Sequence, residues 1–130
     1  MMMYKSYLVI AAILGAVTVA LGAFGAHGLK DKLTTDALNI FETAVKYQFY
    51  HVFALLAAGI LFQQFGNASM LWSGRLFIAG IVLFSGSLYA LTYFKAIGNS
   101  SMNWLGAVTP LGGLCFIAGW IMMALAVWKR

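Results

Sequence analysis

The stretch Tyr7–Phe24, YLVIAAILGAVTVALGAF, contains no charged residue. An apolar run of about 20 residues is what a helix needs to cross roughly 30 Å of hydrocarbon. Three further apolar runs follow it, and only short links separate them: they cover Phe49–Phe65, Arg75–Phe94 and Trp104–Trp128. The sequence therefore predicts a single domain, residues 1–130, in which four helices span a membrane.

The composition excludes an ordinary soluble domain. Of the 130 residues, 63% are hydrophobic and 8% are charged, whereas soluble domains carry about 25% charged residues. The net charge of +5 comes from basic residues at the ends of the apolar runs, as expected for cations that flank membrane spans. We therefore predict an all-α integral membrane bundle whose partner is the lipid bilayer, and no binding of nucleic acid.

The first apolar run also has features of a secretory signal peptide. Lys5 precedes its apolar core, and the small residues in Ala23–Ala26 are typical of a cleavage site. We favour a retained helix, which gives an even number of spans and places both termini on one side of the membrane. Orientation stays open, because each side then carries four basic residues: Lys5, Arg75, Lys129 and Arg130 against Lys30, Lys32, Lys46 and Lys95.

The longest link, His27–Gln48, has the pattern of an amphipathic helix. Thr34 or Thr35 is suited to cap its start, and Glu42 and Lys46 have the spacing of a favourable ion pair. Its apolar positions recur at helical spacing: Leu33, Ala37, Ile40, Phe41 and Ala44. We predict an interfacial amphipathic helix between spans one and two, with a helix packed on the bundle as the alternative.

Small residues predict where helices approach closely. Ala11, Gly15, Thr18 and Gly22 form a stripe along the first span, and such stripes let membrane helices pack backbone to backbone. Gly25 and Gly28 would then allow a sharp exit from the span. Close packing is also predicted at the following glycines: Gly25, Gly86, Gly112 and Gly113.

Two histidines are the most notable polar residues. His27 ends the first apolar run and His51 begins the second, which predicts that both lie near one interface of the membrane. Polar side chains at membrane depth are costly, so His27, Gln48 and His51 are candidate functional residues. A structural hydrogen-bonding role is favoured, and proton handling or ligand binding is the alternative.

The last two spans carry further polar and helix-breaking residues. Ser85 and Ser87 flank Gly86, a pattern that favours hydrogen bonds across closely packed helices. Pro110 follows Thr109, so the fourth span either bends there or starts there with Thr109 as its cap. A functional hinge at Pro110 is the alternative to a purely structural role.

Four segments carry a resemblance to a known family. They are GAFGAHGL (22–29), YQFYH (47–51), FSGSLY (84–89) and TPLGG (109–113). In this order they resemble the domain-of-unknown-function 423 family of small bacterial inner-membrane proteins, which is related to a small eukaryotic transmembrane protein. The resemblance implies a multi-pass protein of the bacterial cytoplasmic membrane, without an established reaction or catalytic residues.

The usual enzyme motifs are absent from the sequence. It contains no glycine-rich phosphate loop, no cysteine cluster and no His-Glu-x-x-His, and its three acidic residues lie in one link. We therefore predict no catalytic residue, no cofactor and no metal site. Two functions remain. The first is a structural or accessory protein, which acts alone, as a homo-oligomer or with a membrane protein partner. The second is an oligomeric carrier or channel component for a small solute or for protons, which would use His51, Gln48 and Ser85. We favour the accessory role, because the sequence places most polar groups near the interfaces.

Overall fold

The computed structural model describes residues 2–129, which form a bundle of four long helical spans without a strand. Each span has 25 to 31 residues, or about 38–46 Å at 1.5 Å per residue, and is apolar enough to cross a membrane. In chain order the spans are α1 (Lys5–Phe24) with the π-helical turn η1 (Gly25–Leu29); α2 (Thr35–Phe65); α3 (Ala68–Gly80), the π-helical turn η2 (Ile81–Ser85) and α4 (Gly86–Ala96); and the 3₁₀ helix η3 (Ser100–Ala107) with α5 (Thr109–Trp128). The predicted four-span all-α fold is confirmed.

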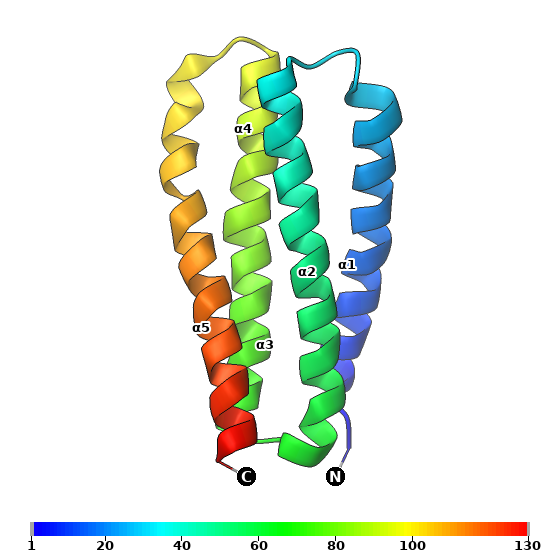
Figure 1. The fold of residues 1–130 in the computed structure, drawn as a ribbon, viewed down its shortest axis with the longest axis vertical. Coiled ribbons are helices and arrows are strands. Elements are labelled where there is room, and N and C mark those ends of the chain that lie inside the picture. The colour runs from blue at the N-terminus through cyan, green and yellow to red at the C-terminus, as the bar shows by residue number, and fades with distance from the viewer. Residues whose placement is uncertain (1, 130) are drawn as a thin grey trace.

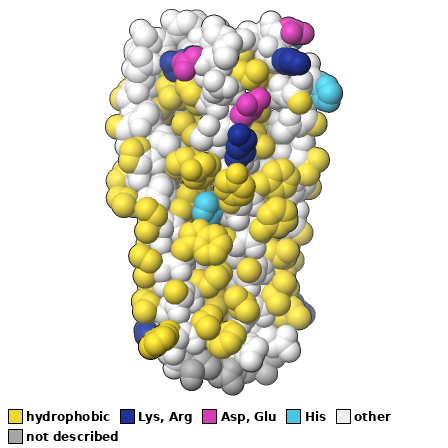
Figure 2. All heavy atoms as spheres, viewed as in Figure 1, with side chains coloured by type: hydrophobic (Ala, Val, Ile, Leu, Met, Phe, Trp, Pro, Cys, Tyr) yellow, Lys and Arg dark blue, Asp and Glu magenta, His cyan; other side chains and the backbone are white. Residues whose placement is uncertain are grey.

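The two ends of the bundle differ in what they carry. Figure 1 shows the α1–α2 link and the α4–η3 link at one end, which we call the link face, and both chain ends at the other, the termini face. On the side seen in Figure 2, acidic side chains lie towards the link face and hydrophobic side chains cover the middle. The prediction that both termini lie on one side of the membrane is confirmed.

The four spans are not equally enclosed. The second span, α2, and the third, α3 to α4, pack on each other, while α1 packs mainly on α2 and α5 mainly on α3. Figure 1 shows α1 and α5 on opposite sides of this central pair. Both therefore keep an apolar outer face, which includes Val9, Ile13 and Val19 on α1 and Leu114 and Ile117 on α5.

The predicted interfacial helix is not a separate element. The structure continues it into the second span as one helix, α2, which begins at Thr35. The Thr34 hydroxyl accepts a hydrogen bond from the backbone N–H of Ala37 at 3.2 Å and so caps this start. No glycine or proline interrupts the chain before Gly59, so nothing separates the amphipathic part from the apolar part. The buried Ala44 shows that the apolar stripe packs on the bundle, which was the alternative.

This longer helix changes the position of the second histidine. His51 lies 16 residues after Thr35, about 24 Å along α2, so the prediction that His51 begins the second span is wrong. His27 is exposed in η1 at the link face. The predicted sharp exit is also wrong, because Gly25 has helical torsion angles and the helix continues to Leu29. The two histidines therefore do not share a site.

The small-residue stripe of α1 faces α2. A Cβ atom added to Gly22 would lie 3.5 Å from Val45, and one added to Gly15 would lie 3.7 Å from Val52. Thr18, on the same stripe, is fully buried. Side chains larger than alanine at these two glycines would therefore push α1 away from α2.

The glycines of the other spans differ sharply in their surroundings. An added Cβ would overlap the Phe84 backbone at Gly112 and would lie 4.0 Å from the Phe84 ring at Gly113. The predicted close packing at Gly86 is wrong, because nothing lies within 4 Å of a Cβ added there. Close contacts that the sequence did not predict occur at further glycines: Gly59, Gly74, Gly80 and Gly119.

Candidate functional site

Polar side chains from three spans meet inside the bundle around Gln48. The Gln48 Nε2 atom donates to the Thr18 hydroxyl of α1 at 2.7 Å, and the Tyr89 hydroxyl of α4 donates to Gln48 Oε1 at 2.6 Å. Thr18 in turn donates to the backbone carbonyl of Leu14 at 2.5 Å. We call Thr18, Gln48 and Tyr89 the Gln48 network. It joins α1, α2 and α4 through direct hydrogen bonds.

Local sequence explains why these three side chains face inwards. Thr18 is the polar member of the small-residue stripe, and its hydroxyl bonds back to its own helix, as threonine commonly does within membrane spans. Gln48 lies one turn after Ala44 on the buried stripe of α2 and is 3% exposed. A buried amide needs partners for both its oxygen and its nitrogen, and Tyr89 and Thr18 supply them.

Ser85 makes a second hydrogen bond between α2 and the third span, which Gln48 and Tyr89 also join. Its hydroxyl donates to the backbone carbonyl of Ala44 at 2.7 Å, and both residues are fully buried. Ser85 is the last residue of the π-helical turn η2. Because a π-helical turn holds more residues than an α-helical one, η2 also sets the direction in which Ser85 and the following α4 side chains point.

His51 forms a separate cluster on the side of α2 that faces α3 and α5. Its Nδ1 atom lies 2.7 Å from the backbone carbonyl oxygen of Tyr47, and its Nε2 atom lies 3.1 Å from the indole nitrogen of Trp120. A carbonyl only accepts and an indole N–H only donates, so Nδ1 carries the proton and Nε2 accepts. The imidazole is therefore neutral, with both nitrogen atoms in use.

Aromatic rings enclose this imidazole. The His51 ring stacks on Phe116 of α5 with centroids 3.5 Å apart and an angle of 7° between the planes. Phe77 of α3 lies 5.7 Å away, and His51 itself is 5% exposed. Within residues 2–129, no group of three or more His, Cys, Asp or Glu side chains gathers as metal ligands do. The geometry is that of a hydrogen-bonded histidine packed in a core.

Replacing His51 separates its hydrogen-bonding role from a titrating one. His51→Leu should lower the free energy of unfolding by about 1–3 kcal/mol, because the Trp120 indole N–H loses its acceptor. His51→Gln keeps an acceptor and should cost clearly less. Equilibrium unfolding in mixed detergent micelles measures the stability of both variants. In a Trp120→Phe background, which lacks the indole N–H, the two variants should have similar free energies of unfolding. A His51→Leu protein as stable as wild type would contradict the assignment.

The remaining predicted residues have different surroundings. The His27 side chain is exposed in η1, and no side-chain hydrogen bond of His27 is present within residues 2–129. The hydroxyl groups of Ser87 and Thr109 lie 2.6 Å apart and join α4 to the start of α5. Of the two alternatives at Pro110, α5 starts there, with the proline in its first turn; Val108, and not Thr109, occupies the cap position.

The structure does not combine the predicted carrier residues into one polar path. Gln48 faces α1 and α4, His51 faces α3 and α5, and Ser85 is bonded to a backbone carbonyl. The partners Tyr89 and Trp120 were not predicted. A weak signal existed for them, because each is an aromatic residue with a hydrogen-bonding group inside an apolar run, where such a group usually finds a partner.

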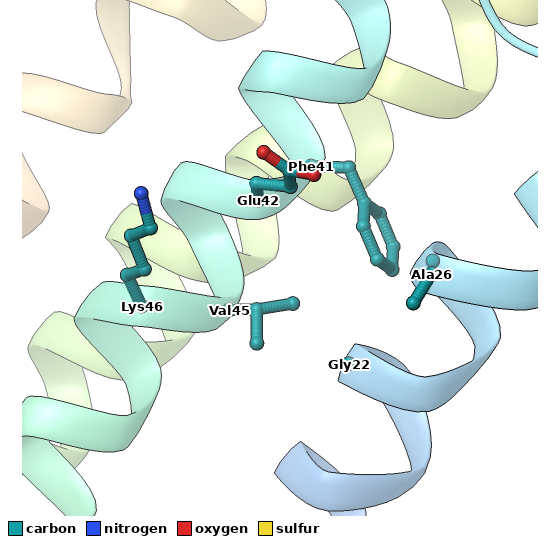
Figure 3. Close-up of a pocket in the computed structure, with 7 residues that line it drawn as sticks. Gly22, Ala26, Phe41, Glu42, Val45 and Lys46 are labelled. Atoms are coloured by element: carbon teal, nitrogen blue, oxygen red, sulfur yellow. The ribbon is translucent and has the colours of Figure 1, made fainter. Parts of the chain in front are cut away.

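Two of the pockets towards the link face lie beside the end of α1. The first, of about 160 Å³, lies between the end of α1 and the first turns of α2. Figure 3 shows Phe41 and Val45 pointing from α2 towards α1, with Ala26 facing Phe41. The second, of about 210 Å³, lies between the end of α1 and α4 and is almost entirely apolar. Phe41 lines both pockets.

Fold and site together define a multi-pass helical membrane protein whose buried polar side chains join its spans. The family model described as "Protein of unknown function (DUF423)" matches residues 21–113, and the chain belongs to this family. The UPF0382 membrane protein YwdK of Bacillus subtilis is 42% identical over 126 residues, which cover 96% of this chain and 98% of that protein. A UPF0382 membrane protein of Staphylococcus haemolyticus is 40% identical over 127 residues, 96% of this chain and 97% of its own. No solved structure matches the chain.

These relatives also place the protein in the cell. Proteins named as membrane proteins match nearly the whole chain, and the structure has four helices that are long and apolar enough to cross a bilayer. The chain is therefore a multi-pass protein of the cell membrane. The family description assigns no activity, so function has to be argued from the site.

Proposed function

We propose that the protein is a non-catalytic structural or accessory component of the cell membrane, which supports membrane integrity or a membrane complex. One observation carries this proposal. In residues 2–129, every buried side-chain nitrogen or oxygen atom has a hydrogen-bond partner. A carrier needs polar groups that are free to replace the water around its solute, whereas most of the buried polar groups here join one helix to another.

The positions of the charged residues support the same role. A proton relay through His51 would need an acceptor such as a carboxylate close to the ring, and the groups around the ring are a backbone carbonyl, an indole, phenyl rings and the phenol ring of Tyr47. The three acids of the chain are Asp31, Asp36 and Glu42, all in the link or the first turns of α2. A carboxylate there is far from the middle of the span.

An accessory role implies a partner besides lipid. The outer faces of α1 and α5 are apolar and exposed, and they lie on opposite sides of the bundle (Figure 1). A homo-oligomer or another membrane protein would contact one of these faces. The proposal does not require α1 or α5 to move away from the bundle. The Gln48 network joins α1 to the central pair, and the His51 cluster joins α5 to it.

Proton flux tests the competing carrier role. The purified protein is reconstituted into vesicles that contain a pH-sensitive dye, and a pH gradient is applied with the membrane potential clamped. We expect the same leak from wild type, His51→Gln and protein-free vesicles. A wild-type flux that His51→Gln abolishes while leaving the fold intact would overturn the proposal.

Deletion in the native bacterium tests the accessory role itself. Loss of the gene should increase permeability to a dye that intact membranes exclude, or should reduce the yield of a membrane complex on native gels. A plasmid copy carrying His51→Gln should restore the wild-type result, because the hydrogen-bonding capacity is retained. Complementation by wild type but not by a stably inserted His51→Gln protein would instead favour a titrating histidine.

A further inference from the structure

The pocket between α1 and α2 lies at the depth where lipid headgroups meet acyl chains. Lys46 is the last charged residue of α2, and the 19 uncharged residues that follow it, to Phe65, span about 28 Å, close to the roughly 30 Å of hydrocarbon. Lys46 therefore lies near the boundary of the hydrocarbon, and Glu42, one turn earlier, lies about 6 Å further towards the link face.

The wall of this pocket is apolar and closely packed. Gly22, Gly25 and Ala26 of the first span face Phe41 and Val45 of α2. A Cβ atom at Gly25 would lie 2.6 Å from the Phe41 ring, so the backbone of η1 itself forms part of the wall. A hollow of this kind at the acyl boundary accepts methylene groups.

The rim of the pocket carries two opposite charges without a partner in the protein. Glu42 and Lys46 are both exposed and line the pocket, and Figure 3 shows them on one side of α2. The predicted ion pair between them is not formed, since the one ion pair within residues 2–129 joins Lys95 and Asp36 at 3.4 Å. Charges at the edge of the hydrocarbon need a partner, and here the surroundings must supply it.

We infer that this pocket binds a zwitterionic phospholipid that carries a phosphate and a primary ammonium group. The order of charges along the membrane normal fits such a lipid. Lys46 is the deeper residue and faces the phosphate, while Glu42 is nearer the link face and faces the ammonium, which lies outside the phosphate in the lipid. The flexible lysine side chain can also extend outwards along the surface to reach the phosphate.

The same charges discriminate against other common lipids. An anionic lipid without an amine would meet Lys46 but would be repelled by Glu42. A choline headgroup carries its positive charge without an N–H donor and cannot hydrogen-bond to the carboxylate. The site holds this lipid whether the protein is an accessory component or a carrier, so the inference goes beyond the proposed function.

Native mass spectrometry tests the inference. The protein is released from nanodiscs that contain equal amounts of phosphatidylethanolamine, phosphatidylcholine and phosphatidylglycerol, and the lipids retained on it are counted. Wild type should retain phosphatidylethanolamine in preference to the other two. Lys46→Gln should reduce this retention about threefold, and Glu42→Gln should shift the ratio of ethanolamine to glycerol lipid about threefold towards glycerol, the size of effect expected for an exposed ion pair.

Controls distinguish the pocket from general surface charge. Asp31→Asn and Lys32→Gln change the charge of the link outside the pocket lining and should leave retention unchanged. Ala26→Leu fills the hollow and should reduce retention of all three lipids. Equal retention of the three lipids by wild type, or an unchanged lipid ratio in Glu42→Gln, would overturn the inference. So would a lipid-free dimer that Ala26→Leu converts to a monomer, because a second copy would then occupy the pocket.

Discussion

Replacing Gly112 by alanine should lower the free energy of unfolding by about 1–3 kcal/mol, the usual cost of excess volume in a packed core. At this position α5 crosses the π-helical turn η2. A Cβ atom would overlap the backbone nitrogen of Phe84 and lie 2.7 Å from its Cα. A side chain could rotate away from the added methyl group, but a backbone segment cannot move without displacing Ser85 and its hydrogen bond to α2.

Neighbouring glycines provide matched controls for this substitution. Gly113→Ala adds the same methyl group 4.0 Å from the Phe84 ring, and Gly86→Ala adds it where nothing lies within 4 Å. Both should be neutral or should stabilise the protein by up to about 1 kcal/mol, because alanine is the better helix former. Unfolding in mixed detergent micelles compares all three variants. Equal stability of Gly112→Ala and Gly113→Ala would refute the proposed crossing.

The number of spans could be predicted because it depends on composition and length alone. The start of the second span could not. Its apolar run begins at Phe49, but the helix begins at Thr35. The helix can start earlier because a bilayer includes polar layers in which charged helical residues such as Glu42 are stable. With no glycine or proline before Gly59, the charged and apolar parts form one helix.

Gln48 and His51, at the centres of the two buried clusters, were among the predicted candidates, but their hydrogen-bond partners were not. Gln48 and His51 were identified because polar side chains inside apolar runs are costly unless paired. Their partners are distant in sequence: Tyr89 is 41 residues away from Gln48, and Trp120 is 69 residues away from His51. Such pairing depends on how each helix is rotated about its axis, and one sequence does not show that rotation.

The glycines illustrate the same limit. Gly86 was predicted to pack closely because Ser85 and Ser87 flank it, yet it faces open space. The π-helical turn η2 ends just before it and changes which side of α4 faces the bundle. Nothing in the local sequence marks this turn. Gly80, which was not predicted, instead packs against the Phe116 ring.

Replacing Gln48 should have the other large effect. Gln48→Leu removes the hydrogen bonds to Thr18 and Tyr89, and it leaves the Tyr89 hydroxyl without its acceptor in a partly buried position. The expected loss is about 2 kcal/mol, since a buried donor without an acceptor costs more than the bond itself contributes. Tyr89→Phe should cost less, because Gln48 keeps its bond to Thr18.

The central claim is that the buried polar side chains hold the spans together, and a double-mutant cycle between Gln48 and Tyr89 tests it most directly. Unfolding free energies are measured for wild type, Gln48→Leu, Tyr89→Phe and the double variant in the same micelles. The double variant should cost less than the sum of the two single variants by about 0.6 kcal/mol or more, the average for hydrogen bonds between membrane helices. Strictly additive losses would contradict the claim, because they would show that the two side chains do not stabilise the bundle through one another.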